Sequence, residues 1–543
     1  MEMYVGATGA LQLLKAVFVA FAWAFDAQQV FISAFTDAQP QWHCLAASTG
    51  NSSCSPAAAS PCGLPPGSWA WDRPAVATVV SEWGLTCAGP ALISLPASSF
   101  FAGSLAGGFL LTTAEFSYAG CLHYNSSLAD SLLGRKKMLL VSLASTSVAG
   151  ALTASLAANV WAYAALRFVS SFFRSMLGTC ALVLSAELVG RRHRNAVNVA
   201  SFVCFAVGFL SLPAIAYAFR DASWWNLYIW TSAPCLFYSV LFYFLVQESP
   251  RWLLVRGRKQ DAVEALQQII SLNDGASRAT TTASFSAALD ACAMDADGGN
   301  AAAGGGGVFA ALHAMWERRW ALRRLAAIMA ASFGVGMVYF GMPLNVGGLG
   351  PNLYLSVTYN ALSELPSAAL AWVLAGRANR RGSVMALTAA AGACSLACAA
   401  VPRRAAAARM AAEVASFSAA CTAFDVVLIY TTELFPTSVR NSAVGLVRQA
   451  LVLGGVAAPV PIALGRDRSF WSFGVFGIAI GCSGLFIAFL PETRGKSMSD
   501  TMEEEEEERN GEAARRSRVA PCTGGVTAGR PVQTTDRDSY VVV

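Results

Sequence analysis

The chain has 543 residues, of which 55% are hydrophobic and only 13% are charged. Soluble domains carry about 25% charged residues, so the composition argues against a large soluble helical protein. The net charge of +5 does not indicate a nucleic-acid partner, because the Lys and Arg residues stand in short clusters between apolar runs. Those runs recur with about 18 or more residues each, the length that crosses ~30 Å of hydrocarbon. We therefore predict an all-α membrane protein surrounded by lipid.

The first apolar run covers residues 11–34 and follows a short segment, 1–10, that we expect to be a cytoplasmic N-terminus. This run is too long for the core of a cleavable signal peptide, and no small-residue cleavage site separates it from polar sequence. We therefore interpret it as the first membrane helix.

Hydropathy predicts about twelve membrane helices in all. Two long polar segments interrupt them: 35–90 after the first helix, and 247–322 after the sixth. This spacing predicts an N-terminal six-helix half (11–246), a cytoplasmic linker (247–322), a C-terminal six-helix half (323–491) and a disordered cytoplasmic tail (492–543). The predicted helices are 11–34, 91–113, 138–157, 159–186, 197–219, 224–246, 323–345, 350–375, 382–402, 406–432, 442–464 and 470–490.

The basic residues predict the orientation of these helices. Five clusters fall on one side if the helices alternate, whereas the long first loop on the other side contains a single basic residue, Arg73. An excess of Lys and Arg marks cytoplasmic loops, so both termini are predicted to be cytoplasmic. Arg403, Arg404, Arg466 and Arg468 fall on the opposite side, so the rule holds by majority.

The first loop has the features of an extracytoplasmic segment. It contains Cys44, Cys54, Cys62 and Cys87, which can form two disulfides in one of three pairings. Asn51 begins an Asn-Ser-Ser sequence, a glycosylation acceptor in such a loop.

An internal repeat supports two related halves. Three sequence signatures on the predicted cytoplasmic side occur twice, about 245 residues apart, as expected for a duplicated six-helix unit. Two halves related by an axis along the membrane normal are the major facilitator architecture. The matched stretches are 130–136 with 376–381, 186–195 with 432–441, and 248–251 with 491–494.

These signatures resemble the organic ion transporter family of the major facilitator superfamily, and within it the plant organic cation/carnitine transporters. The main stretches are Glu248–Leu253, Glu433–Asn441 and Pro491–Gly495, with support from Phe25–Gln29, Trp42–Cys44, Ser81–Leu85, Tyr430–Glu433 and Arg448–Leu451. The resemblance implies the major facilitator fold and transport of a small organic cation or zwitterion, such as carnitine or a polyamine, by alternating access. One departure is Ala114–Ser127, which looks like an insertion into the second helix and contains side chains that hydrocarbon tolerates poorly.

Acidic side chains inside predicted spans are candidate sites, because burying a charge in the membrane is costly. Asp26 is expected to meet a substrate ammonium or a coupling proton, with Gln29 as a further candidate substrate ligand. The alternative is that Asp26 is a structural partner of Gln28, Gln29 or a nearby Arg. Glu364 is a second candidate cation ligand, and the family resemblance favours an acidic residue in this region. Asp425 is a candidate for coupling.

Basic, amide and aromatic residues complete the candidate site. Arg167 resembles the buried Arg of proton-coupled relatives and is expected to take part in coupling. Arg448 and Gln449 either face the cavity, where they could bind a carboxylate, or lie near the cytoplasmic surface. Tyr339 can contribute to an aromatic wall that attracts a quaternary ammonium group.

The repeated cytoplasmic signatures are predicted to act as gate and scaffold rather than as substrate ligands. Their charged side chains can form inter-helix ion pairs that break as the two halves rock, or they can act as topology signals alone. The predicted gating residues are Asp130, Arg135, Glu187, Glu248, Arg251, Arg377, Glu433, Arg440 and Glu492.

No sequence pattern indicates an enzyme or a cofactor. Gly304–Gly307 is not followed by the Lys-Ser/Thr of a nucleotide-binding loop, and neither a zinc-binding spacing nor a nucleophile elbow is present. The alternatives left open are a sugar or organic-anion carrier of the same fold and a transport-dead sensor or splice form. We expect a monomer in the plasma membrane, with the vacuolar membrane as the alternative, and protons as the candidate coupling ion.

Overall fold

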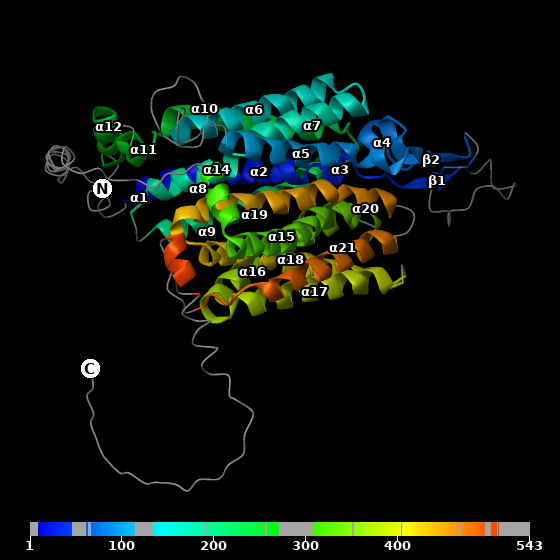
Figure 1. The fold of residues 1–543 in the computed structure, drawn as a ribbon. Helices are drawn as coiled ribbons and strands as arrows, with labels where there is room; N and C mark the ends of the chain where they lie inside the picture. The colour runs from blue at the N-terminus through cyan, green and yellow to red at the C-terminus, as the bar shows by residue number, and fades with distance from the viewer. Residues whose placement is uncertain are drawn as a thin grey trace, which may run out of the picture.

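The computed structural model describes residues 9–45, 61–62, 64, 67–113, 134–190, 193–255, 258–270, 308–349, 352–402, 404–465, 469–494, 501–507 and 509. Long helices run side by side through the molecule in two groups, one from each half of the chain (Figure 1). Within the described residues, eleven helical segments are long and apolar enough to cross a membrane.

The first group of helices contains six of these segments. The first is built from α1, α2 and α3, which together cover Ala10–Thr36, and the fourth from α7 and α8. The bounds are α1 Ala10–Ala20, α2 Ala22–Phe31, α3 Ser33–Thr36, α5 Pro90–Thr113, α6 Gly134–Leu156, α7 Val160–Arg174, α8 Leu177–Glu187, α9 Arg194–Ala218 and α10 Trp225–Leu245.

The second group repeats this arrangement. Its bounds are α15 Arg319–Asn345, α16 Leu353–Arg377, α17 Arg380–Ala400, α18 Ala406–Leu434, α19 Thr437–Ala457, α20 Pro459–Leu464, α21 Ser469–Gly484 and the short 3-10 helix η7 Leu485–Phe489. Helix α16, the eighth membrane helix in chain order, brings the total in the described residues to twelve and packs between α9 and α18. Its polar residues, among them Asn360 and Glu364, reduce its hydropathy below that of the other eleven. The prediction of about twelve helices in two halves is confirmed.

The two halves meet along two helix pairs. Helix α5 packs against α19, and α9 packs against α16. These pairs join the second span to the eleventh and the fifth to the eighth, so exchanging the halves converts one pair into the other. The contacts therefore have the pseudo-twofold relation that the sequence repeat predicts.

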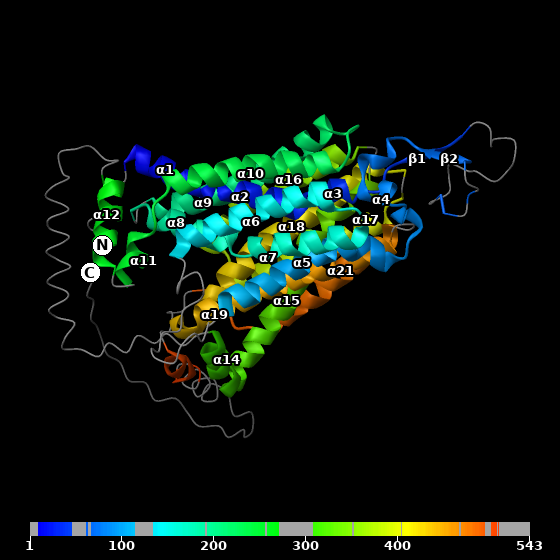
Figure 2. The same ribbon diagram turned by 90° about the horizontal axis from the view of Figure 1, so that it is seen from above.

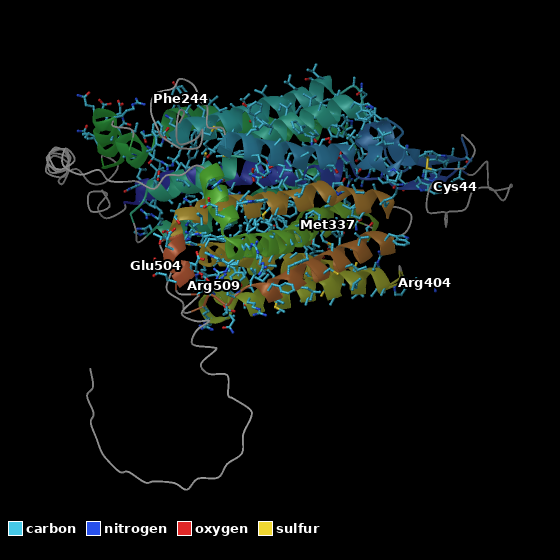
Figure 3. The ribbon with its side chains drawn as sticks, in the orientation of Figure 1. Cys44, Phe244, Met337, Arg404, Glu504 and Arg509 are labelled. Carbon is cyan, nitrogen blue, oxygen red and sulfur yellow. A yellow bond between two sulfur atoms is a disulfide. The ribbon has the colours of Figure 1, made fainter. Side chains whose placement is uncertain are left out.

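The surface of the bundle is apolar and its interior contains polar groups, as expected for a bundle surrounded by lipid. Large apolar side chains project outward, including Phe244, which is 73% exposed and is seen at the edge of the bundle in Figure 3. Polar groups such as Arg167, at 1% exposure, lie inside. Because apolar side chains cost nothing when they face hydrocarbon, whereas unpaired polar groups cost several kcal/mol, this arrangement fits a protein embedded in a bilayer.

The two ends of the bundle carry different structures. At one end, β1 (Trp42–Cys44) and β2 (Trp69–Trp71) form an antiparallel pair beside α4 (Val79–Glu82). A disulfide joins Cys62 to Cys87, and Cys44 is also disulfide-bonded. At the opposite end lie the short helices α11 (Pro250–Val255), α12 (Lys259–Ile270) and α14 (Val308–Glu317) (Figure 2).

Part of the chain expected to form a disordered tail is helical. Residues 502–507 form a short helix, with Met502 buried in the same apolar cluster as α15. Arg324 binds Glu505 at 2.7 Å, and Arg318 pairs with Glu503. The buried side chain of Met502 and the Arg–Glu ion pairs therefore hold residues 502–507 against the bundle. The acidic composition of this segment alone predicts that it is solvated. Asp130, Cys54, Asn51 and the unusual stretch Ala114–Ser127 lie outside the described residues.

Close helix contacts depend on glycine at a few positions. A methyl group built on Gly336 of α15 would lie 2.0 Å from the carbonyl oxygen of Leu451 in α19. In the other half, a methyl group on Gly208 of α9 would lie 2.1 Å from the carbonyl oxygen of Ala24 in α2. These backbone neighbours cannot move aside, so only glycine permits the close approach.

We predict that Gly336→Ala lowers the stability of the protein by about 1–3 kcal/mol, because the added methyl overpacks the α15–α19 contact. The matched control is Gly445→Ala in α19, where nothing lies within 4 Å of the added methyl. Thermal unfolding of the detergent-solubilised protein measures the effect. Equal melting temperatures for the two variants would contradict the predicted close packing.

Candidate functional site

Asp26 is neutralised within the first half of the bundle. Its Oδ1 lies 2.6 Å from Nη1 of Arg174, and both side chains are about nine-tenths buried. Arg174 also donates to the hydroxyl of Ser104 at 3.3 Å. Of the two roles considered for Asp26, the structure shows a contact with a nearby Arg, and a substrate cation would have to compete with that guanidinium.

Arg167 lies on the same helix as Arg174 but is held differently. Its Nη2 donates to the Ser33 hydroxyl at 2.8 Å and its Nη1 to the backbone carbonyl of Gln29 at 3.3 Å. The guanidinium carbon is 4.0 Å from the centre of the Phe100 ring. Gln29 therefore contacts Arg167 through its backbone carbonyl. Its side-chain oxygen is buried and has no hydrogen-bond partner in the described part of the chain.

The second half presents acidic groups without basic partners. Glu364 of α16 accepts a hydrogen bond from the hydroxyl of Tyr339 in α15 at 3.0 Å. Asp425 of α18 lies close enough to Glu364 to influence it electrostatically. Over the residues that the structure describes, neither carboxylate is paired with a Lys or Arg.

Tyr339 is the centre of an aromatic cluster that spans the two halves. Its ring stacks on Phe417 at 5.8 Å and lies 4.8 Å from Phe424, both in α18. It also meets Phe31 of the first half edge-on at 6.3 Å. The ring faces and paired carboxylates together form a region that favours a cation, through cation–π attraction and charge.

A different buried acid, Glu413, lies within the second half and is fully enclosed. Its Oε1 accepts from the Asn360 amide at 3.0 Å, which links α18 to α16. This contact is local to the second half.

Arg448 and Gln449 lie at the interface between the halves. Nη1 of Arg448 donates to the Thr179 hydroxyl of α8 at 3.0 Å. A methyl group built on Gly108 of α5 would lie 2.0 Å from the Gln449 amide nitrogen, so this side chain packs directly on the first half. The two residues therefore contact the first half, and the choice between the cavity-facing and the near-surface alternative stays a prediction.

The sequence comparisons bear on this arrangement. The family model described as Major Facilitator Superfamily matches residues 75–459. The chain belongs to the major facilitator superfamily. Its relatives include Organic cation/carnitine transporter 3 of Arabidopsis thaliana, which is 46% identical over 93% of this chain and 92% of the relative. Organic cation/carnitine transporter 2 of the same plant is 45% identical over 93% of each chain.

A more distant relative is Solute carrier family 22 member 12 of Homo sapiens, at 29% identity over 86% of this chain and 79% of the relative. Among solved structures, the xylose transporter XylE from E. coli in a partially occluded inward-open conformation superposes with a TM-score of 0.60. It is 17% identical and the match covers 90% of this chain and 99% of XylE. This likeness shows the fold. The chain is therefore an integral, multi-pass transporter of the organic cation/carnitine transporter family.

The repeated signatures of this transporter cap helices in the same way in each half. Glu248 accepts from the backbone N–H of Lys136 at 3.0 Å, at the start of α6. Glu492 accepts from the backbone N–H of Arg380 at 2.9 Å, at the start of α17. A carboxylate at a helix N-terminus satisfies free N–H groups and interacts favourably with the helix dipole.

The ion pairs of these signatures lie within each half. Arg135 pairs with Glu187 at 3.5 Å in the first half, and Arg380 pairs with Glu433 at 2.9 Å in the second. The sequence predicts that such pairs break when the halves rock. The structure does not fit this prediction, because rigid-body motion of two halves leaves contacts inside each half intact. Their role in this conformation is to hold each half together.

The remaining predicted gating residues take other positions. Arg380 occupies the place expected for Arg377, which is exposed. Arg440 donates to the backbone carbonyl of Phe435 at 3.3 Å, where α18 turns into α19. The side chain of Arg251 is outside the described part of the structure.

The contacts that do cross between the halves near β1 and β2 involve residues that sequence reasoning missed. Arg73 Nη1 donates to the Tyr354 hydroxyl of α16 at 2.7 Å. The Tyr354 ring also stacks on Phe35 of α3 at 5.6 Å and meets Tyr217 of α9 at 5.4 Å. The one available signal was Arg73 itself, the single basic residue in the long first loop.

We predict that Asp26→Asn and Arg174→Gln each destabilise the transporter by about 3–5 kcal/mol, because each leaves one buried charge unpaired. The double variant Asp26→Asn/Arg174→Gln should recover a large part of that loss, because it removes both charges. Thermal unfolding and surface abundance of the three variants measure the coupling. Additive losses in the double variant would show that the pair does not act as a unit.

Proposed function

We propose that this transporter carries small organic cations or zwitterions, with carnitine-like and polyamine-like compounds as the expected class. The observation that carries the proposal is the presence of two buried carboxylates, Glu364 and Asp425, that lie near each other without a basic partner among the described residues. Two like charges inside a membrane bundle are costly unless a cation joins them. A substrate ammonium group supplies that charge.

The surrounding groups fit such a ligand. Tyr339 holds Glu364 by a 3.0 Å hydrogen bond and presents an aromatic ring beside it. The rings of Phe417 and Phe424 lie next to Tyr339, so an alkylated ammonium group would meet both charge and ring faces. Each cation–π contact contributes about 0.5–2 kcal/mol. The names of the Arabidopsis relatives agree with this substrate class.

Alternating access follows from the two-half architecture. The Glu364–Tyr339 site lies in the second half and reaches Phe31 of the first half, so relative movement of the halves changes its surroundings. Opening at the β1–β2 end requires that the Arg73–Tyr354 contact breaks. Movement near α8 requires a change in the Arg448–Thr179 contact. These two contacts, rather than the ion pairs within each half, are our candidates for the gates.

We further propose that protons are the coupling ion and that the Asp26–Arg174 pair takes part in coupling. The carboxylate and the guanidinium of this pair are buried and lie 2.6 Å apart, and ionisable pairs inside membrane spans are typical of proton relays. We assign the transporter to the plasma membrane, with both termini in the cytoplasm. Uptake at two pH values, with and without a protonophore, tests proton coupling. Microscopy of a tagged chain tests the location, and a signal at the vacuolar membrane would contradict the plasma-membrane assignment.

We predict that Glu364→Gln lowers uptake of labelled carnitine by at least about tenfold at unchanged surface abundance, because a charge-assisted contact worth ~1.5–3 kcal/mol is lost. Glu317→Gln, at an exposed carboxylate whose side chain is 65% accessible, is the matched control and should transport normally. Labelled glucose serves as the neutral comparison. Uptake of glucose but not of carnitine by the unaltered protein, or full carnitine uptake by Glu364→Gln, would contradict the proposal.

A further inference from the structure

A cavity of about 540 Å³ lies between the two halves at the β1–β2 end of the bundle. Its walls come from the end of α3, the end of α9 and the start of α16. The aromatic residues Phe35, Tyr217 and Tyr354 are part of these walls. The cavity is therefore separate from the Glu364 site and is lined by both halves.

Tyr354 forms the centre of the aromatic wall. Phe35 stacks on its ring at 5.6 Å with an angle of 14° between the planes, and Tyr217 meets it edge-on at 5.4 Å. Both neighbours belong to the first half, whereas Tyr354 belongs to the second. The ring is thus held in a fixed place by contacts that depend on how the halves are arranged.

A positive group already sits on this ring. The guanidinium carbon of Arg73 lies 5.4 Å from the ring centre of Tyr354, within the distance of a cation–π contact. The same guanidinium donates to the Tyr354 hydroxyl at 2.7 Å. The ring therefore binds a planar organic cation in this conformation, and that cation is a side chain of the protein.

The charge of Arg73 is not neutralised by its neighbour. Asp72 is bound instead to His43, with 2.5 Å between Oδ1 and Nδ1. Arg220 provides a contrast: it lies 4.7 Å from the ring centre of Tyr217 but also pairs with Asp221 at 3.2 Å. Arg73 is exposed, and in the described part of the chain its contacts are with Tyr354. A contact of this kind exchanges readily with another cation, because an exposed cation–π contact is weak.

We infer that Tyr354, supported by Phe35 and Tyr217, is an entry subsite for organic cations, and that Arg73 occupies it when this end of the transporter is closed. A ligand ammonium group that takes the place of Arg73 breaks the contact between the first loop and α16. Binding at this subsite and opening between the halves are then linked. The chemical class of the ligand rests on the proposed function, whereas the location rests on the Arg73–Tyr354 geometry.

The test measures occupancy of the cavity directly in the purified full-length chain. Gln39 lines this cavity and the adjoining one, so its replacement, Gln39→Cys, places a reactive thiol there. Choline is the probe, and 3,3-dimethylbutan-1-ol is its neutral isostere. Mass spectrometry of the peptide that contains position 39 gives the rate of thiol modification.

We predict that Arg73→Ala lowers the choline concentration that half-protects this thiol by about two- to fivefold, because the competing guanidinium is gone. Arg73→Gln, which keeps a hydrogen-bonding side chain without the charge, should behave like Arg73→Ala. Arg258→Ala, at an exposed Arg that pairs with Asp261 outside this cavity, is the matched control and should behave like the parent. Dimethylbutanol should protect in none of them.

Two further variants decide between explanations. Adding Tyr354→Leu to Arg73→Ala should abolish protection by choline, because the aromatic platform is lost. Glu364→Gln should leave protection intact even though we expect it to lower uptake, which separates failure of this subsite from failure of the proposed function. The inference is overturned if Arg73→Ala leaves protection unchanged, if Arg258→Ala has the same effect as Arg73→Ala, or if Glu364→Gln removes protection.

Discussion

The need to neutralise charge inside a lipid-embedded bundle governs the organisation of this transporter. The two halves meet this need differently. In the first half, Asp26 is paired with Arg174 at 2.6 Å, so the charge is neutral without a ligand. In the second half, Glu364 and Asp425 lie near each other, and no Lys or Arg pairs with them among the described residues. The asymmetry between two otherwise related halves points to the second as the place where a cation is required.

The pseudo-symmetry itself has a clear physical basis at the helix ends. In each half, one carboxylate, Glu248 or Glu492, caps the helix that follows the half's second span. One Arg–Glu pair then ties that helix to the end of another span. These contacts stabilise each half as a unit, which is what rigid-body movement between halves demands. The contacts that we propose as gates lie elsewhere, at Arg448–Thr179 and at Arg73–Tyr354.

Aromatic residues appear at two levels along the proposed path of a cation. Tyr339 lies beside Glu364 within the bundle, and Tyr354 lies at the β1–β2 end beside Arg73. The deeper position combines aromatic rings with carboxylates, whereas the outer one offers an aromatic face that a protein guanidinium occupies. Binding at the deeper level is therefore expected to be stronger, because charge pairing away from water exceeds an exposed cation–π contact.

The sequence by itself determined the class of the protein. Runs of apolar residues require membrane helices, and signatures repeated about 245 residues apart require two related halves, because both are properties of local composition and spacing. It also identified the residues with unusual chemistry, including Asp26, Glu364 and Tyr339. Charged groups inside apolar runs are visible without any knowledge of the fold.

Only the tertiary structure decided which of these groups meet. Arg167 and Arg174 stand seven residues apart on one helix and so share a face. The relative placement of α2 and α7 in the folded bundle selects Arg174 as the partner of Asp26. Arg73 and Tyr354 are 281 residues apart, and no local pattern predicts their contact. Pairings of this kind depend on how helices from distant parts of the chain are placed side by side, which hydropathy and periodicity do not encode.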